Sequence, residues 1–279
     1  MNRSPTMDDK AEIQKQWDRD PCGAVTADDA DPESAGWYES VRRHRYEEYA
    51  PWMPAVMRFE EWKDRDVLEI GVGLGSDHLS FALGGSKMHA LDLSAEHLRH
   101  TRKHLAVHGL QTEGVLGDAE ANPFPEASFD LVYSFGVLHH TPDTAAAVRE
   151  VLRVLRPGGA ALIGLYHRDS WFFWLRTVLF RGVLRCRILT KGWRRLLSEI
   201  EYRSADNPAV PLVKVFSRAS AAALFAGFED VRMSVHHVEA GHFPPPLSWL
   251  LRPLARRTLE RWLGFGGWYA IIRARKPVG

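Results

Sequence analysis

The chain has 279 residues, of which 45% are hydrophobic and 25% charged, enough for one large α/β domain or one domain with a cap. A formal net charge of +1 argues against a general nucleic-acid-binding protein. The two cysteines, Cys22 and Cys186, offer no disulfide framework and favour a reducing, cytoplasmic compartment. We expect neither a secretory signal nor a transmembrane helix, because no long apolar run occurs.

The first part of the chain, residues 1–58, is predicted to form a lid of helices. Apolar and aromatic residues recur at helical spacing within 37–50, and a shorter helix is expected at 11–20. This lid is expected to cover the domain that follows.

Strands and helices alternate within 59–167. The expected strands lie at 67–70, 87–91, 114–116, 131–134 and 160–165. The helices between them have their own signals, such as Ser94 as an N-cap and Gly109 as a C-cap. This alternation predicts an α/β fold with a doubly wound, mostly parallel sheet, whose ligands bind at the carboxyl ends of the strands.

The alternation lapses at 168–216, which is predicted to be a helical cap rich in arginine and aromatic residues. It resumes in 217–279, where two further strands complete a seven-stranded sheet around a second cap insertion, 239–266. Three interpretations of the first cap stay open. Its side chains could line a pocket for an apolar or anionic acceptor, rest on a membrane surface, or pack as the core of a lid.

A glycine-rich turn follows the first strand, in the sequence VLEIGVGLGSD at 67–77. Glycine is favoured where the backbone adopts positive φ or where a ligand approaches it closely. A dinucleotide-binding loop would read G-x-G-x-x-G, and Ser76 stands where the third glycine of that pattern would be. An NAD-dependent oxidoreductase is therefore the weaker functional alternative. The other alternative is that these glycines only form an ordinary turn of an α/β domain, with no ligand.

Acidic residues end the next two strands. Asp92 lies 21 positions after Gly71, the distance at which a carboxylate reaches ribose hydroxyls in nucleotide-binding α/β folds. Asp118 could accept a hydrogen bond from an exocyclic adenine amine. The structural alternatives are a helix-start aspartate for the first and a turn-capping aspartate for the second.

Five motifs occur in order: VLEIGVGLG, LDLS, GDAEANPFPEASFDLV, SFGVLHHTPD and VLRVLRPGG. Together they resemble the type 11 branch of the class I S-adenosylmethionine (SAM) dependent methyltransferases, which includes the ubiquinone/menaquinone C-methyltransferases. The resemblance is close over about 60–165 and loose over 215–275. It implies a Rossmann-like fold with SAM as the cofactor and S-adenosylhomocysteine as the product.

The resemblance also implies where the cofactor binds. The family's glycine loop cradles the methionyl part of SAM, the acid after the second strand holds the ribose, and the one after the third contacts the adenine. By position, these and neighbouring roles fall on Glu69, Gly71, Gly73, Gly75, Asp92, Leu93, Asp118, Ala119 and Ser134. Phe135 would stand beside Ser134 near the sulfonium.

Methyl transfer from a sulfonium requires in-line positioning and exclusion of water, and no metal is expected. A base could assist, and the candidates are His139, His140 and His167. Adjacent residues on a helix face different ways, so at most one of the first two should face the substrate. The alternative is that the HHTPD segment only shapes its turn.

The expected acceptor is a small hydrophobic or aromatic molecule, such as a secondary metabolite. Five residues are candidates to contact it: Tyr38, Arg45, Tyr166, Trp171 and Trp174. We expect no nucleic-acid partner and no membrane contact. Whether the chain is a monomer or a homodimer stays open, and a SAM-binding module without catalysis is a further alternative.

Overall fold

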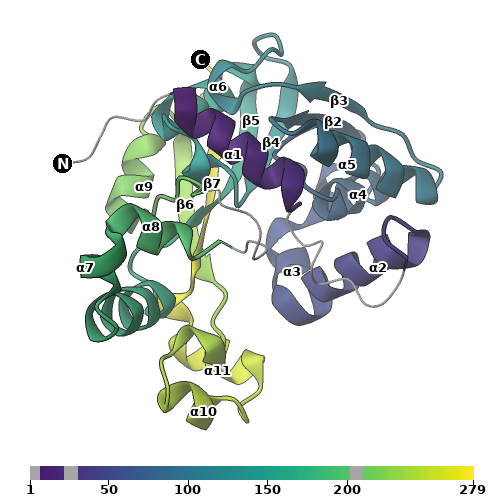
Figure 1. Ribbon diagram of the computed structural model, residues 1–279. Helices are drawn as coiled ribbons and strands as arrows, with labels where there is room; N and C mark the ends of the chain where they lie inside the picture. Colours follow the sequence, from purple (N-terminus) through teal and green to yellow (C-terminus); the bar gives the residue numbers. More distant parts are fainter. Residues whose placement is uncertain (1–6, 22–30, 202–209) are drawn as a thin grey trace.

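A seven-stranded sheet forms the centre of the computed structural model, which describes residues 7–21, 31–201 and 210–279 (Figure 1). Its strands are β1 (Asp66–Ile70), β2 (Lys87–Asp92), β3 (Glu113–Leu116), β4 (Phe129–Phe135), β5 (Leu155–Tyr166), β6 (Glu229–His236) and β7 (Tyr269–Arg275). They lie in the order β3-β2-β1-β4-β5-β7-β6, and only β7 runs antiparallel to its neighbours. The predicted doubly wound, mostly parallel sheet is confirmed.

The α-helices flank the sheet and build the caps (Figure 1). They are α1 (Met7–Arg19), α2 (Ala35–Arg43), α3 (Met53–Met57), α4 (Ser76–Leu83), α5 (Ala95–Val107), α6 (Thr144–Val154), α7 (Arg187–Lys191), α8 (Trp193–Ser198), α9 (Arg218–Leu224), α10 (Leu247–Leu251) and α11 (Arg256–Leu263). Shorter or differently wound helices are η2 (His44–Tyr49), η3 (Phe59–Trp62), η4 (Ala119–Ala121), η5 (Leu138–His140), η6 (Phe172–Leu184), η7 (Ala240–His242) and η8 (Gly264–Gly266). Among the described residues, no helix has the length and apolar character needed to cross a bilayer.

Two elements differ from the sequence prediction. The helix expected at 37–50 divides into α2 and the π-helix η2, because the backbone changes its hydrogen-bond spacing at His44. The fifth strand begins at Leu155 rather than Ala160, since the RPGG segment continues β5 along β4 through a local register shift. Cys186 is exposed and unpaired, and Cys22 lies outside the described residues.

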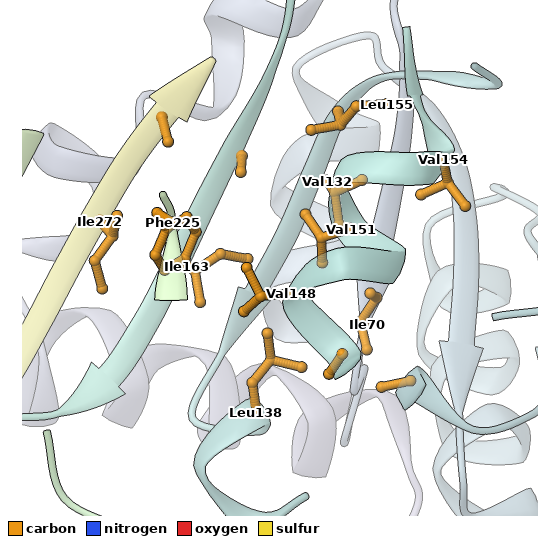
Figure 2. Packing of buried hydrophobic residues seen from close by; sticks show 14 of the residues in the cluster. Ile70, Val132, Leu138, Val148, Val151, Val154, Leu155, Ile163, Phe225 and Ile272 are labelled. Carbon is orange, nitrogen blue, oxygen red and sulfur yellow. The ribbon is translucent and has the colours of Figure 1, made fainter. Parts of the chain in front are cut away.

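The core divides between the two faces of the sheet because side chains alternate along each strand. On one face, Ile70, Val132 and Ile272 pack with α6 and with Phe225, just after α9 (Figure 2). On the other face, residues of the same strands, among them Tyr133, pack with α3, α4 and the caps. Both faces are therefore covered, as the near-continuous apolar strands require.

The strand order reverses between β1 and β4, where ligands of such sheets bind. The helix α1 crosses this carboxyl edge of the sheet (Figure 1), while α10 and α11 project away from it. The site is thus enclosed by three segments distant in sequence: α1, the loops after the strands, and the cap around η6.

Candidate functional site

A cavity of about 640 Å³ lies over the carboxyl ends of β1, β2, β4 and β5. This volume falls within the range of small-molecule sites. The residues that line it at the strand ends are Glu69, Ile70, Gly71, Val72, Gly73, Leu74, Ser76, Asp77, Leu91, Asp92, Leu93, Gly117, Asp118, Ala119, Phe135, Gly136, Val137 and Tyr166. The cavity therefore brings most of the predicted cofactor residues together.

The glycine loop has the backbone that its sequence predicts. Gly71, Gly73 and Gly75 have φ of +81°, +53° and +79°. A Cβ on Gly71 would lie 2.2 Å from Cγ2 of Val137, so only glycine fits this position. A Cβ on Gly73 would meet nothing within 4 Å, because this residue faces the open cavity. Gly75 is instead the N-cap of α4 and does not line the cavity.

Asp92 connects the glycine loop to the end of β2. Its two carboxylate oxygens accept separate hydrogen bonds, one from the N–H of Val72 at 2.8 Å and one from the N–H of Ser94 at 2.9 Å. Burial raises the pKa of this carboxyl, but His97 at 3.1 Å and the two N–H groups outweigh it and lower the pKa overall. Asp92 is therefore ionised at neutral pH, as an acceptor for ribose hydroxyls must be.

Asp118 and Ala119 lie at the opposite end of the same loop cluster. Asp118 forms an ion pair with Lys10 of α1, whose Nζ also lies 2.6 Å from Glu120. Ile13 and Trp17 from the same helix line the cavity beside them. The N-terminal helix therefore covers the expected adenine position, which the sequence indicated only as a lid.

A buried polar cluster lies under the glycine loop. Arg45 donates to Asp77 at 2.7 Å, and the hydroxyls of Tyr46 and Tyr133 donate to the same carboxylate. Burial raises the pKa of Asp77, but Arg45 and the two hydroxyls hold it below its usual value. Asp77 was missed by the sequence analysis, although its place directly after the glycine loop was a usable signal.

Glu69 ends this cluster on the cavity side. Its Oε2 lies 3.0 Å from Nδ1 of the buried His78, whose Nε2 lies 2.7 Å from the Thr112 hydroxyl. Burial and then the neighbouring charge of Asp77 raise the pKa of Glu69 well above its ordinary value. A cationic group placed beside Glu69 would lower that pKa again and bind to it.

Ser134 does not line the cavity. Its hydroxyl donates to the Ile70 carbonyl at 2.8 Å, within the sheet, and its side chain is fully buried. Phe135, the next residue on β4, lines the cavity instead, since alternate side chains of a strand point to opposite faces.

Of the three candidate bases, only His140 lines the cavity. Its Nδ1 donates to the Leu212 carbonyl at 2.6 Å, which leaves Nε2 as the acceptor nitrogen. Nε2 has no hydrogen-bond partner among the described residues and lies 3.6 Å from Oε1 of Glu201. His139 is fully buried, and burial followed by His140 lowers its pKa well below 6.5. His167 is also buried and bonds the Gly267 carbonyl at 3.0 Å.

The five candidate acceptor contacts divide. Arg45 and Tyr166 line the cavity. Tyr38 does not, because its side chain is fully buried and its hydroxyl bonds Nδ1 of His100 in α5 at 2.9 Å. Trp171 donates to the Leu263 carbonyl at 2.9 Å, and Trp174 is 49% exposed, so both lie away from the cavity.

Other residues that line the cavity beyond Tyr166 were not singled out as candidates from the sequence. They are Phe172, Arg176, Arg181, Glu201, His237, Glu239, His242, Trp268 and Tyr269. The composition of 168–203 signalled its role in general terms, but which residues turn inward depends on the winding of η6. Sequence spacing alone carried no signal for the C-terminal histidines.

In the part of the chain that the structure describes, two groups have donor atoms within 4.8 Å of one another, as a metal ion would require: His139 with His140 and Glu201, and His237 with Glu239 and His242. In the second group, Arg256 already binds Glu239. Burial, followed by Arg256, lowers the pKa of His242 to about 3. A cation in the second group would compete with this arginine, so we assign no metal there.

Comparisons with known proteins agree with this geometry. Residues 68–163 match the family model of a methyltransferase domain, Methyltransf_11. The chain is 31% identical over 167 residues to 27-O-demethylrifamycin SV methyltransferase of Amycolatopsis mediterranei, covering 57% of each chain. It is 32% identical over 120 residues to a ubiquinone biosynthesis O-methyltransferase of Serratia proteamaculans, covering 42% of this chain and 48% of that one.

A third relative is a sterol 24-C-methyltransferase of Gibberella zeae, 28% identical over 250 residues, with 85% of this chain and 59% of the relative covered. The chain thus spans about half the length of the curated relatives it matches. Among solved structures, a SAM-dependent methyltransferase of Methanosarcina mazei has a TM-score of 0.57 at 20% identity, over 81% of this chain and 98% of that one. The [4+2]-cyclase SpnF has a TM-score of 0.54 at 18% identity, over 100% of this chain and 99% of that one.

The strand order, the glycine loop and the acidic strand ends over one cavity define the class I SAM-dependent methyltransferase fold. The family match covers residues 68–163, so this segment is similar to the methyltransferase domain of the type 11 branch, and SAM is the cofactor that this domain and fold imply. The resemblance seen in the sequence motifs is confirmed.

Proposed function

We propose that this chain transfers the methyl group of SAM to a small, largely apolar or aromatic acceptor by direct in-line transfer. The supporting observation is one continuous cavity with two chemically different ends. One end carries the glycine loop, Asp92 and Asp118. The other is walled by aromatic rings, with the Trp268 ring 4.4 Å from Tyr166 and 4.8 Å from Phe172.

The residues present fit SAM at the first end. Gly73 leaves open space beside the loop that a Cβ would enter, and Asp92 presents an ionised carboxylate. Glu69 lines the cavity with its pKa raised by burial and by Asp77, and the ammonium of the methionyl part would lower that pKa and bind the carboxylate. When bound, SAM supplies a methyl group on a sulfonium, which is electrophilic without further activation.

The chain then has to exclude water and orient the acceptor. Ile13 and Trp17 of α1 cover the cofactor end, and the cap around η6 covers the acceptor end. Aromatic walls provide large apolar contact area for a ring system or an isoprenoid-like chain. The relatives are named for a demethylrifamycin, for ubiquinone biosynthesis and for a sterol, and acceptors of these kinds are largely apolar.

His140 is the residue that we assign as the base for an acidic acceptor hydroxyl. The bond from Nδ1 to Leu212 fixes its tautomer and leaves Nε2 as the nitrogen that can accept a proton. Glu201 stands 3.6 Å from Nε2 and would stabilise the imidazolium that forms. Neither His139 nor His167 reaches the cavity, so neither is assigned this role.

The test uses wild-type protein, SAM and a panel of phenols, hydroquinones and long-chain alcohols, with methylated product detected by mass spectrometry. His140→Gln should lower kcat about 10²–10⁴-fold and leave S-adenosylhomocysteine affinity unchanged. His108→Gln, at an exposed histidine outside the cavity, is the matched control and should change neither. Cofactor binding without methylation of any acceptor would support the non-catalytic alternative.

A further inference from the structure

A second cavity, of about 440 Å³, adjoins the acceptor end and is rich in arginine. It shares Arg176, Arg181 and Glu201 with the main cavity. Arg185, Arg187 and Glu199 complete its charged lining, so four arginines face two glutamates. The two cavities therefore meet at a pair of arginines, Arg176 and Arg181, beside a single glutamate.

The winding of η6 creates this arrangement. In a π-helix, hydrogen bonds span five residues, and one turn contains about 4.4 residues. Arg176 and Arg181 are five residues apart, and Arg185 follows two turns after Arg176 at the end of the helix. All three therefore share one face, whereas α-helical winding would place Arg185 opposite Arg176.

Within the described part of the chain, these guanidinium groups have no carboxylate partner. No described carboxylate oxygen forms an ion pair within 4.0 Å of Arg176, Arg181 or Arg185. Arg176 donates to the Phe243 carbonyl at 3.1 Å, and Arg181 has a long contact of 3.5 Å to the Glu199 carbonyl. Arg185 lies over the Phe180 ring at 4.9 Å.

The nearby glutamates are engaged elsewhere. Glu199 pairs with Arg187 and with Lys191, the latter at 2.7 Å, while Glu201 faces His140. Burial, followed by the charge of Arg176, lowers the pKa of Arg181. Like charges held together at a cavity wall are unfavourable unless an anion joins them, and arginine is well suited to bind carboxylate or phosphate oxygens.

We infer that Arg176 and Arg181 form an anion subsite, and that the methyl acceptor is an apolar molecule with a carboxylate or phosphate group. The inference rests on the proposed function and names its substrate class. The anionic group sits at the cavity junction, the apolar body lies against Phe172, which begins the same helix, and the reacting end lies toward His140.

The test measures binding to the full chain saturated with S-adenosylhomocysteine. The probes are 4-phenylbutyrate, phenyl phosphate and the uncharged 4-phenylbutanamide, titrated calorimetrically. Either anion should bind at least tenfold more tightly than the amide. Arg181→Gln should reduce anion affinity about ten- to a hundredfold and leave the amide unaffected.

Arg195→Gln is the matched control, since Arg195 is an exposed arginine of the same cap and lies outside both cavities. This substitution removes the same charge as Arg181→Gln. Arg181→Gln should also unfold at the same temperature as the wild type or higher, because it relieves like-charge repulsion; a merely structural arginine would give a lower one. Equal affinity for acid and amide, no saturable binding of either anion, or equal losses in both variants would overturn the subsite. Failure of S-adenosylhomocysteine to bind would instead refute the proposed function.

Discussion

Replacing Asp92 with asparagine tests how the cofactor end is built. The two carboxylate oxygens each accept one backbone N–H, from Val72 at 2.8 Å and from Ser94 at 2.9 Å. An asparagine has a single oxygen, so in either orientation one buried N–H faces an amide donor. Either the glycine loop or the start of α5 then loses its hydrogen bond to residue 92.

The magnitude follows from these contacts. Losing one buried hydrogen bond to a charged acceptor costs about 1.5–3 kcal/mol. The lost hydrogen bond weakens the loop conformation that binds the cofactor, and the ribose hydroxyls also lose an ionised acceptor. The affinity for S-adenosylhomocysteine should therefore fall about ten- to several-hundredfold. Unfolding stability should fall as well, by about 1–3 kcal/mol.

The assay is calorimetric titration of S-adenosylhomocysteine, with urea unfolding to confirm that the variant is folded. Asp66→Asn is the control, because Asp66 lies at the amino end of β1, away from the carboxyl ends of the strands, and pairs with Arg156. It should leave affinity unchanged within twofold. A folded Asp92→Asn protein that binds within threefold of the wild type would refute the role of Asp92.

Two further predictions concern stability. Gly71→Ala should lower the free energy of unfolding in urea by about 3 kcal/mol or more, because it combines positive φ with a Cβ 2.2 Å from Val137. Gly109→Ala, with positive φ but no neighbour within 4 Å, should lower it by about 1 kcal/mol. Equal losses of stability in the two variants would contradict this. Burial lowers the pKa of His78 from 6.5 to about 3, so the unfolded state binds more protons between these values and stability is lost as pH falls below 6.5. The loss from His78 is about 1.4 kcal/mol at pH 5.5, and His78→Asn should flatten the pH profile by that amount; parallel profiles would contradict the assignment.

The cofactor end was predictable because its signals are local in sequence. Gly71, Gly73, Asp92 and Asp118 each lie at the end of a strand or within three residues of it, and the parallel topology brings the ends of such strands together. Ser134 shows the limit of this reasoning. The strand was placed correctly, but the side chain of its neighbour Phe135 faces the cavity.

The acceptor end was less predictable because it depends on how the caps wind and pack. The aromatic and basic composition of 168–203 indicated a pocket, yet Trp171 and Trp174 point elsewhere while Phe172 and Arg176 line the cavity. A π-helix changes which residues share a face, and no sequence pattern in the segment predicts π-helical hydrogen bonding. The contribution of α1, through Lys10 and Trp17, depends on a tertiary contact.

Binding of SAM in this cavity, over the glycine loop, can be tested directly by calorimetry. Wild-type protein is titrated with S-adenosylhomocysteine and, separately, with NADH. Saturable binding of S-adenosylhomocysteine with one site per chain, and no binding of NADH, is the result expected. Binding of NADH without S-adenosylhomocysteine would contradict the account and favour an oxidoreductase.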